Sequence, residues 1–96
     1  MTLNQRIYDA DQAKLVLENE AFQRAFEDIK QELTEQWKTS PARDQDGREK
    51  LWLMLKLLDK LELCLKSSLD SGKLAAKELE YQQSMADKAK AWVGLS

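Results

Sequence analysis

The sequence contains no histidine, and cysteine, proline and glycine are scarce. Histidine is the usual general base near neutral pH and the commonest metal ligand, so its absence removes both roles. The single cysteine, Cys64, cannot form a disulfide within the chain, which suits a reducing cytosol. Its place among leucines predicts a small buried hydrophobe. We find no catalytic or metal-ligating motif, and we expect no enzymatic activity, no metal and no cofactor.

Long apolar runs and an excess of charge of one sign are also missing. No apolar run approaches the ~20 residues of a membrane span, and Met1 to Tyr8 hold no signal-peptide core. The net charge of -2 gives no basic field for a nucleic acid. DNA binding would need an oligomer that gathers Lys56, Lys60 and Lys66 on one face. We expect a single cytoplasmic domain, residues 1–96, with no membrane or nucleic-acid partner.

Few residues break or disfavour helices, so the composition predicts an all-α fold. Asp9 and Gln12 resemble a capping box and predict a short N-terminal helix over 10–17. Asn19 is a good N-cap for the next segment. Apolar side chains recur there at spacings of three and four, which predicts a one-faced amphipathic helix over 20–38.

A proline separates this helix from the next. Pro41 cannot continue the helical hydrogen bonds and pushes the preceding residue out of the α region. Asp46 and Glu49 then form a second capping box, which predicts a helix over 47–71. Because the loop is short, we expect these two helices to form an antiparallel helical hairpin.

The helix predicted over 47–71 carries more leucine than one helix–helix contact can use. On a wheel at about 100° per residue, its apolar side chains fill an arc of roughly 200°, about twice what a surface helix needs. Trp52 and Leu63 fall outside this arc, on a charged stripe. Either the C-terminal helix or the segment around Ile7 and Tyr8 covers them, or they lie in a subunit interface. We expect a homo-oligomer. Its candidate interface residues are Trp52, Leu53, Leu57, Leu63 and Leu79.

Gly72 leaves two possibilities for the C-terminal part of the chain. It can cap the leucine-rich helix, with a new helix starting near Lys73. It can also lie within one longer helix, at a cost of about 1 kcal/mol relative to alanine. We favour a break or kink. The C-terminal helix that follows has a thin face of small apolar residues, and we expect it to pack on the exposed sides of the leucine-rich helix.

The loop between the two long helices and its flanks, residues 37–52, form the tip and hold the strongest candidate binding site. Arg43, Arg48 and the free amides at the start of the second helix suit an anion such as phosphate. A flanking tryptophan can stack on a base. Alternatively, these groups serve capping and ion pairs with Asp44, Asp46 and Glu49. The candidate ligand-binding residues are Trp37, Lys38, Arg43, Arg48, Lys50 and Trp52.

The stretch from Glu35 to Met54, with its Trp-Lys-Thr-Ser-Pro-Ala-Arg core, resembles a pattern in small helical proteins of tailed bacteriophages and prophages. These proteins are often encoded near head genes. The resemblance extends from about Asn19 to Leu79 and is most specific at the tip. It implies a phage origin and a place in the cytoplasm of an infected bacterial cell. It brings no catalytic residue with it.

Two functions follow as hypotheses. In the first, a homo-oligomer binds a small anionic nucleotide. Phage proteins of similar size and helical design sequester nucleotide immune signals in this way during anti-phage defence. In the second, the protein is an accessory factor in virion head assembly or DNA packaging, and it contacts a phage head protein through its helices. We rank the first slightly ahead because the chemistry of the tip supplies a reason for it.

Overall fold

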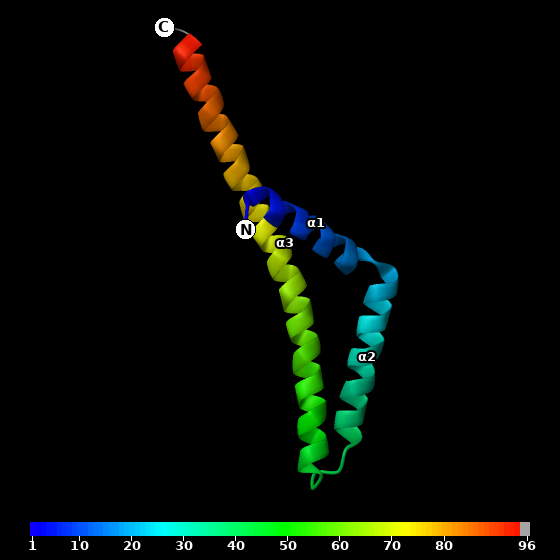
Figure 1. The fold of residues 1–96 in the computed structure, drawn as a ribbon. Helices are drawn as coiled ribbons and strands as arrows, with labels where there is room; N and C mark the ends of the chain where they lie inside the picture. The colour runs from blue at the N-terminus through cyan, green and yellow to red at the C-terminus, as the bar shows by residue number, and fades with distance from the viewer. Residues whose placement is uncertain (95–96) are drawn as a thin grey trace.

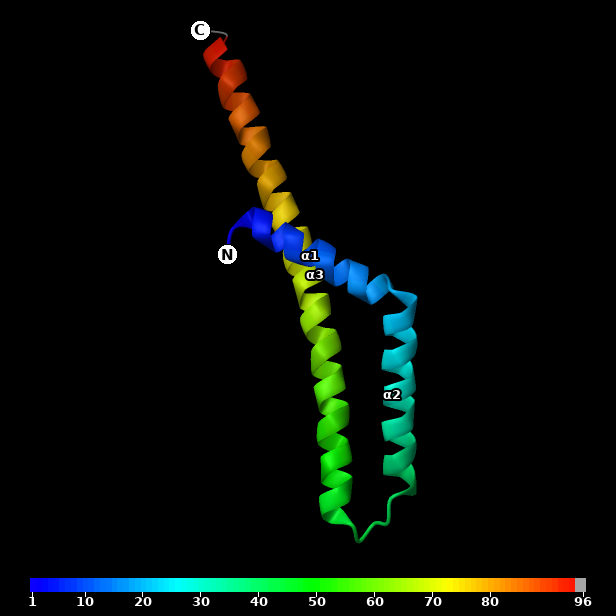
Figure 2. The same cartoon turned by 45° about the vertical axis from the view of Figure 1, so that its right-hand side comes forward.

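The computed structural model describes residues 1–94 and contains three helices, α1 (Leu3–Glu18), α2 (Glu20–Thr39) and α3 (Gln45–Gly94) (Figure 1). No strand occurs within the described residues, in agreement with the predicted all-α fold. α2 runs alongside the first half of α3 in the opposite direction, and α1 crosses α3 near its middle (Figure 2). The second half of α3 continues beyond this crossing as a projecting rod.

α1 begins earlier than the sequence predicted. The Thr2 hydroxyl oxygen accepts a hydrogen bond from the Gln5 backbone N–H at 3.1 Å, which makes Thr2 the N-cap. Asp9 and Gln12 therefore lie inside the helix, and the predicted capping box is wrong. With a cap at Thr2 and no breaker after it, the helix extends over 16 residues instead of starting at residue 10.

The bounds of α2 confirm the local signals. The Asn19 side-chain oxygen accepts from the Phe22 N–H at 2.9 Å, so Asn19 is the predicted N-cap. At the other end, Ser40 adopts an extended backbone, with φ -68° and ψ 140°, as expected for the residue before Pro41. The helix over 20–38 is thus confirmed to within one residue.

α3 starts two residues before its predicted position. The Asp44 carboxylate accepts from the Gly47 N–H at 3.1 Å, and the Asp44 carbonyl accepts from the Arg48 N–H at 3.0 Å. Asp44 therefore takes the N-cap role that we assigned to Asp46, and the second predicted capping box is wrong. Both aspartates can cap a helix, and the earlier one is reached first after the turn at Pro41.

The predicted break at Gly72 is also wrong, because α3 runs through it as one helix of 50 residues. Gly72 has no positive φ, and it is buried under α1. A Cβ placed on it would overlap the Cβ of Ala10 and lie 3.2 Å from the Arg6 carbonyl oxygen. Glycine is thus present here because two helix backbones approach closely, and it does not cap a helix.

The crossing of α1 and α3 combines small residues with one polar clamp. Ala13 and Ala75 are 5% and 0% exposed beside the contact of Ala10 with Gly72. Arg6 donates from Nε to the Ser71 hydroxyl at 2.9 Å and from Nη2 to the Ser71 carbonyl at 3.0 Å. This clamp fixes the point at which α1 crosses α3.

Residues 1–94 by themselves form no central hydrophobic core. The chain has extents of 80 × 26 × 16 Å and a radius of gyration of 22.0 Å, against about 12–13 Å for a compact chain of this length. Its accessible surface is 7896 Å², roughly 2,200 Å² more than a compact chain of this mass exposes. Among residues 1–94, no large side chain is fully buried. The fold therefore leaves apolar surface that this chain does not cover.

Candidate functional site

Arg48 fastens the start of α3 to the end of α2. Its Nη1 donates to the Trp37 carbonyl at 3.2 Å, to the Ser40 carbonyl at 3.2 Å and to the Ser40 hydroxyl at 2.8 Å. The guanidinium carbon also lies 4.5 Å from the centroid of the Trp37 ring. Arg48 thus adds hydrogen bonds to carbonyls at the end of α2, and it stacks on the last aromatic ring of that helix.

Two of the groups that the sequence offered to an anion already have partners within the chain. The guanidinium of Arg48 is directed at the end of α2. The Gly47 amide, in the first turn of α3, donates to the carboxylate of Asp44. These are capping contacts, the alternative that the sequence left open for the tip.

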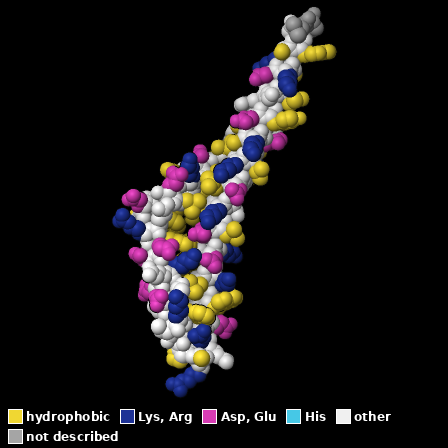
Figure 3. Space-filling model, turned by 180° about the vertical axis from the view of Figure 1, so that it is seen from behind, with side chains coloured by type: hydrophobic (Ala, Val, Ile, Leu, Met, Phe, Trp, Pro, Cys, Tyr) yellow, Lys and Arg dark blue, Asp and Glu magenta, His cyan; other side chains and the backbone are white. Residues whose placement is uncertain are grey.

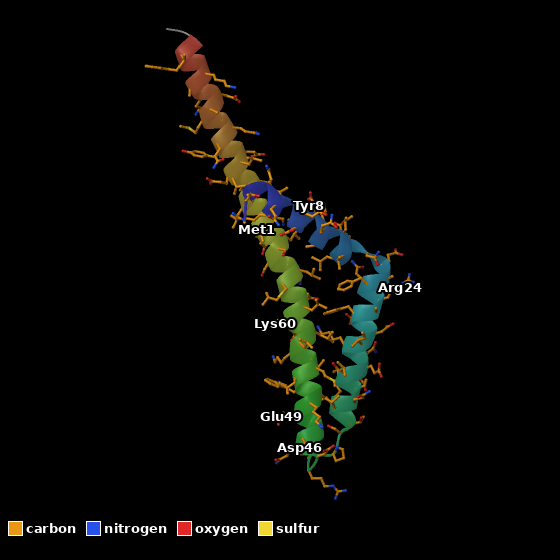
Figure 4. All side chains as sticks on the ribbon, viewed as in Figure 1. Met1, Tyr8, Arg24, Asp46, Glu49 and Lys60 are labelled. Atoms are coloured by element: carbon orange, nitrogen blue, oxygen red, sulfur yellow. The ribbon has the colours of Figure 1, made fainter. Side chains whose placement is uncertain are left out.

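The structure brings together only some of the candidate ligand-binding residues. Trp37 and Arg48 stack on each other. Trp52 lies one turn further along α3, where the Lys56 ammonium is 5.5 Å from the centroid of its ring. Lys38 lies 3.8 Å from Glu35 in an exposed ion pair. The two remaining candidates, Arg43 and Lys50, are exposed. Figure 4 labels Asp46 and Glu49 at this end of α3, so the cations share the tip with acids.

An open cleft of about 370 Å³ lies between the three helices, toward the end of α2 that is far from the tip. Phe22 and Phe26 form part of its wall, with ring centroids 5.9 Å apart, and a 3.1 Å ion pair between Lys66 and Glu62 stands at its edge. The full lining is Leu17, Phe22, Gln23, Phe26, Glu27, Glu62, Lys66 and Leu69. None of these residues belongs to the predicted ligand-binding set.

α3 exposes two separate rows of apolar side chains. The inner row lies on the same side of the helix as the α1 crossing but nearer the tip. Its members are Leu53, Met54, Leu57, Leu61 and Cys64. The outer row lies on the side away from α1 and α2 and runs the length of the helix. Its members are Trp52, Leu63, Leu74, Tyr81, Met85 and Trp92. The exposure of Cys64 shows that its predicted burial is wrong within this chain.

The candidate interface residues divide between these rows. Trp52 and Leu63 belong to the outer row, Leu53 and Leu57 belong to the inner row, and Leu79 is half-buried near the crossing. The other outer-row members beyond residue 72 were missed. Their helical spacing was visible in the sequence, but a presumed break at Gly72 separated them from Trp52 and Leu63.

No other part of the described chain covers Trp52 and Leu63, which are 51% and 64% exposed. The C-terminal part of α3 points away from them and does not fold back (Figure 1). Tyr8, which we expected as part of a cover, is itself 61% exposed. Both intramolecular covers proposed from the sequence are therefore wrong, and a subunit interface stays the open alternative.

Comparison of the chain with protein-family models, with curated proteins and with solved structures gave no match. Within residues 1–94, no cluster of three or more histidine, cysteine, aspartate or glutamate side chains could hold a metal ion. Over the same residues, the helices lack the combination of length and apolar character that crossing a bilayer requires. The exposed rows of α3 are thus the features of residues 1–94 that bear most directly on function.

Proposed function

We propose that this protein is a non-enzymatic assembly protein that self-associates and works through helix–helix contacts along α3. The observation that carries the proposal is the exposure of large apolar side chains on two sides of that 50-residue helix. Apolar surface left in water costs about 25 cal/mol per Å² relative to burial. Exposed patches that run over many residues are typical of surfaces that bind other proteins.

The projecting part of α3 supports the same proposal. Residues 77–94 are exposed apart from the half-buried Leu79. A helix of this length with so little buried surface is marginal in water, because most helical stability in proteins comes from packing. A second helix laid against this segment would supply the missing packing. Self-association therefore explains why the sequence maintains apolar residues so far from the α1 crossing.

The native mass tests self-association directly. A mass that is a multiple of the 11.1 kDa chain supports the proposal. A mass of one chain over the whole accessible concentration range contradicts it. The native mass reports self-association through either row, because the outer and inner rows are both exposed.

The resemblance of the tip to phage proteins supplies a setting for this activity. In that setting, the protein is an accessory factor in virion head assembly or DNA packaging, and its other partner is a phage head protein. Copurification of the tagged chain with portal, coat or terminase protein is the expected result. A deletion phage with normal particle yield would rule out this setting and leave self-association to be judged on its own.

Binding of an anionic nucleotide is the second candidate function. The exposed cations Lys38, Arg43 and Lys50 around the tip favour it. It ranks second because Arg48 and the Gly47 amide already have partners within the chain. Calorimetry of the assembled protein with cyclic dinucleotides and ADP-ribose derivatives tests it. Saturable heat favours this candidate, whereas flat traces across the panel remove it.

A further inference from the structure

We infer that two copies of the chain pair through the outer row of α3, antiparallel, about a two-fold axis beside Gly72. This inference rests on the proposed self-association and deepens it by naming the surface, the direction and the register. It uses the six outer-row side chains defined above. Four observations carry it: the straightness of the row, its accessibility, its area and its symmetry.

The outer row is straight along α3. Trp52, Leu63 and Leu74 follow one another at intervals of eleven residues, and Tyr81 and Trp92 repeat that interval. Eleven residues make about 3.06 turns of an α-helix, and the seven residues from Leu74 to Tyr81 make about 1.94 turns, so the drift from Trp52 to Trp92 is only about 40° in total. The row therefore keeps to one side of the helix over ~60 Å.

The row faces away from both other helices. α2 packs on the side of α3 that holds Glu62, Lys66 and Leu69, which line the cleft together with Phe22 and Phe26 of α2, and α1 covers Gly72. Seen from behind, hydrophobic side chains recur at intervals along the edge of α3 that faces away from α2 (Figure 3). A second long helix can approach this edge without displacing α1 or α2.

The exposed area of the row matches what a stable dimer needs. Its members are between 48% exposed, at Met85, and 76% exposed, at Trp92. With side chains of roughly 200 Å² each, the row presents about 700 Å², close to the ~800 Å² per partner of a standard interface. In a two-fold dimer the same row supplies both halves, so no second surface is required.

Four of the six members of the row are placed symmetrically about position 72, whereas Leu74 and Met85 lie at the levels of the copy's Asp70 and Asp59. In an antiparallel pair centred there, Trp52 lies at the level of the copy's Trp92, and Leu63 lies at the level of its Tyr81. This register places all of the apolar side chains of the row within the overlap. Registers centred elsewhere move each tryptophan away from the level of the other.

Charges beside the row also favour the antiparallel direction. Asp59 comes within one turn of the copy's Lys88, and Asp70 comes within one turn of its Lys77. Lys56 lies at the level of the copy's Lys88, a like-charge position that partly offsets the contact with Asp59, and its long stem lets the ammonium group reach solvent. A parallel pair in register would instead set Asp70 and each of these lysines against its own equivalent, and such like-charge contacts are unfavourable.

Distances between spin labels test the direction and the register. In a Cys64→Ser background, single cysteines replace Lys60, Lys73 or Ser84 and carry the labels. In the inferred pair, the two labels at position 60, one on each copy, lie about 36 Å apart along the helix axis, and so do the two labels at position 84. The two labels at position 73 lie much closer together. Equal short distances at all three positions would show a parallel pair and overturn the inference.

Matched charge substitutions test the surface. Leu63→Lys on the outer row is expected to weaken self-association by ~30-fold or more, whereas Leu57→Lys on the inner row leaves it unchanged. The two leucines are 64% and 68% exposed, so neither change opens a cavity. If Leu57→Lys dissociates the protein and Leu63→Lys does not, the outer-row inference fails and self-association stands. If the unsubstituted chain is monomeric, both the outer-row inference and the proposed self-association fail.

Discussion

Arg48 and Gly72 each hold two helices together, by opposite means. Arg48 reaches from α3 and donates hydrogen bonds to the end of α2. Gly72 contributes by lacking a side chain, which lets the backbone of α1 lie on α3. Neither contact involves a hydrophobic core. At this scale the fold depends on a few specific contacts, so single substitutions have local and distinct consequences.

Gly72→Ala should loosen α1 from α3. The new methyl would overlap Ala10, an overpacking that costs about 1–3 kcal/mol, and this outweighs a gain of at most ~1 kcal/mol in helix propensity. Amide hydrogen exchange should accelerate across α1. Gly94→Ala is the control, because a Cβ there meets nothing within 4 Å. Adding Ala10→Gly should restore slow exchange, and unchanged exchange in Gly72→Ala would show that this contact is not tight.

Arg48→Lys should destabilise the tip although it keeps the charge. Lysine lacks the planar fork that reaches Trp37 and Ser40 together, so we expect a loss of about 1–2 kcal/mol. Urea unfolding followed by Trp fluorescence measures the loss. Arg43→Lys, at an exposed position of the tip just before α3, serves as the control. Equal stability of the two variants would mean that Arg48 does not act as the clamp described here.

The three helices differ in how far their own sequence determines them. α2 was predicted to within one residue because its signals are local: Asn19 caps it and Pro41 ends it. The start of α3 was misplaced because Asp44 and Asp46 carry the same capping chemistry. The course of α3 through Gly72 was missed because the reason lies in α1, far away in the sequence. A glycine in contact with a distant helix has the same sequence signature as one that ends a helix.

The candidate site was also only partly predictable from local sequence signals. The residues of the tip were found from the sequence, but their partners were not, because the choice between an anion and a carbonyl at Arg48 depends on where α2 ends. The outer row was half found. Trp52 and Leu63 stood out as apolar residues on a charged stripe, whereas Tyr81 and Trp92 were assigned to a separate helix. Continuity of α3 was the missing piece of information.

The stability of the projecting part of α3 should depend on the assembly. In the Leu63→Lys variant, which we expect to be monomeric, residues 77–94 lose the packing that the second copy provides. Their amides should then exchange much faster than those of residues 51–69, which pack on α2. In the assembled wild type the two segments should differ far less. Equal protection in both proteins would show that this part of α3 is stable without a partner.

Cys64 gives a chemical check on which row is used. It is exposed and belongs to the inner row. Since the inferred interface uses the outer row, the thiol should react with a maleimide at the same rate in wild type and in the Leu63→Lys variant. Strong protection in wild type alone would place the inner row in the interface and contradict the assignment.

The shape of the whole molecule connects these observations. A chain with extents of 80 × 26 × 16 Å has little interior, and the buried apolar residues among positions 1–94 are alanines at one helix crossing. Much of the remaining apolar surface lies along α3, and a helix of a second copy can cover the outer row of it. In our account, the single chain is therefore a subunit, and the hydrophobic core forms between subunits.

The native mass of the chain, measured by light scattering beside that of the Leu63→Lys variant, tests this account most directly. We predict a multiple of 11.1 kDa for the wild type, and 11.1 kDa for the variant at the same concentration. A wild-type mass of 11.1 kDa at every concentration, with its helices intact, would contradict it.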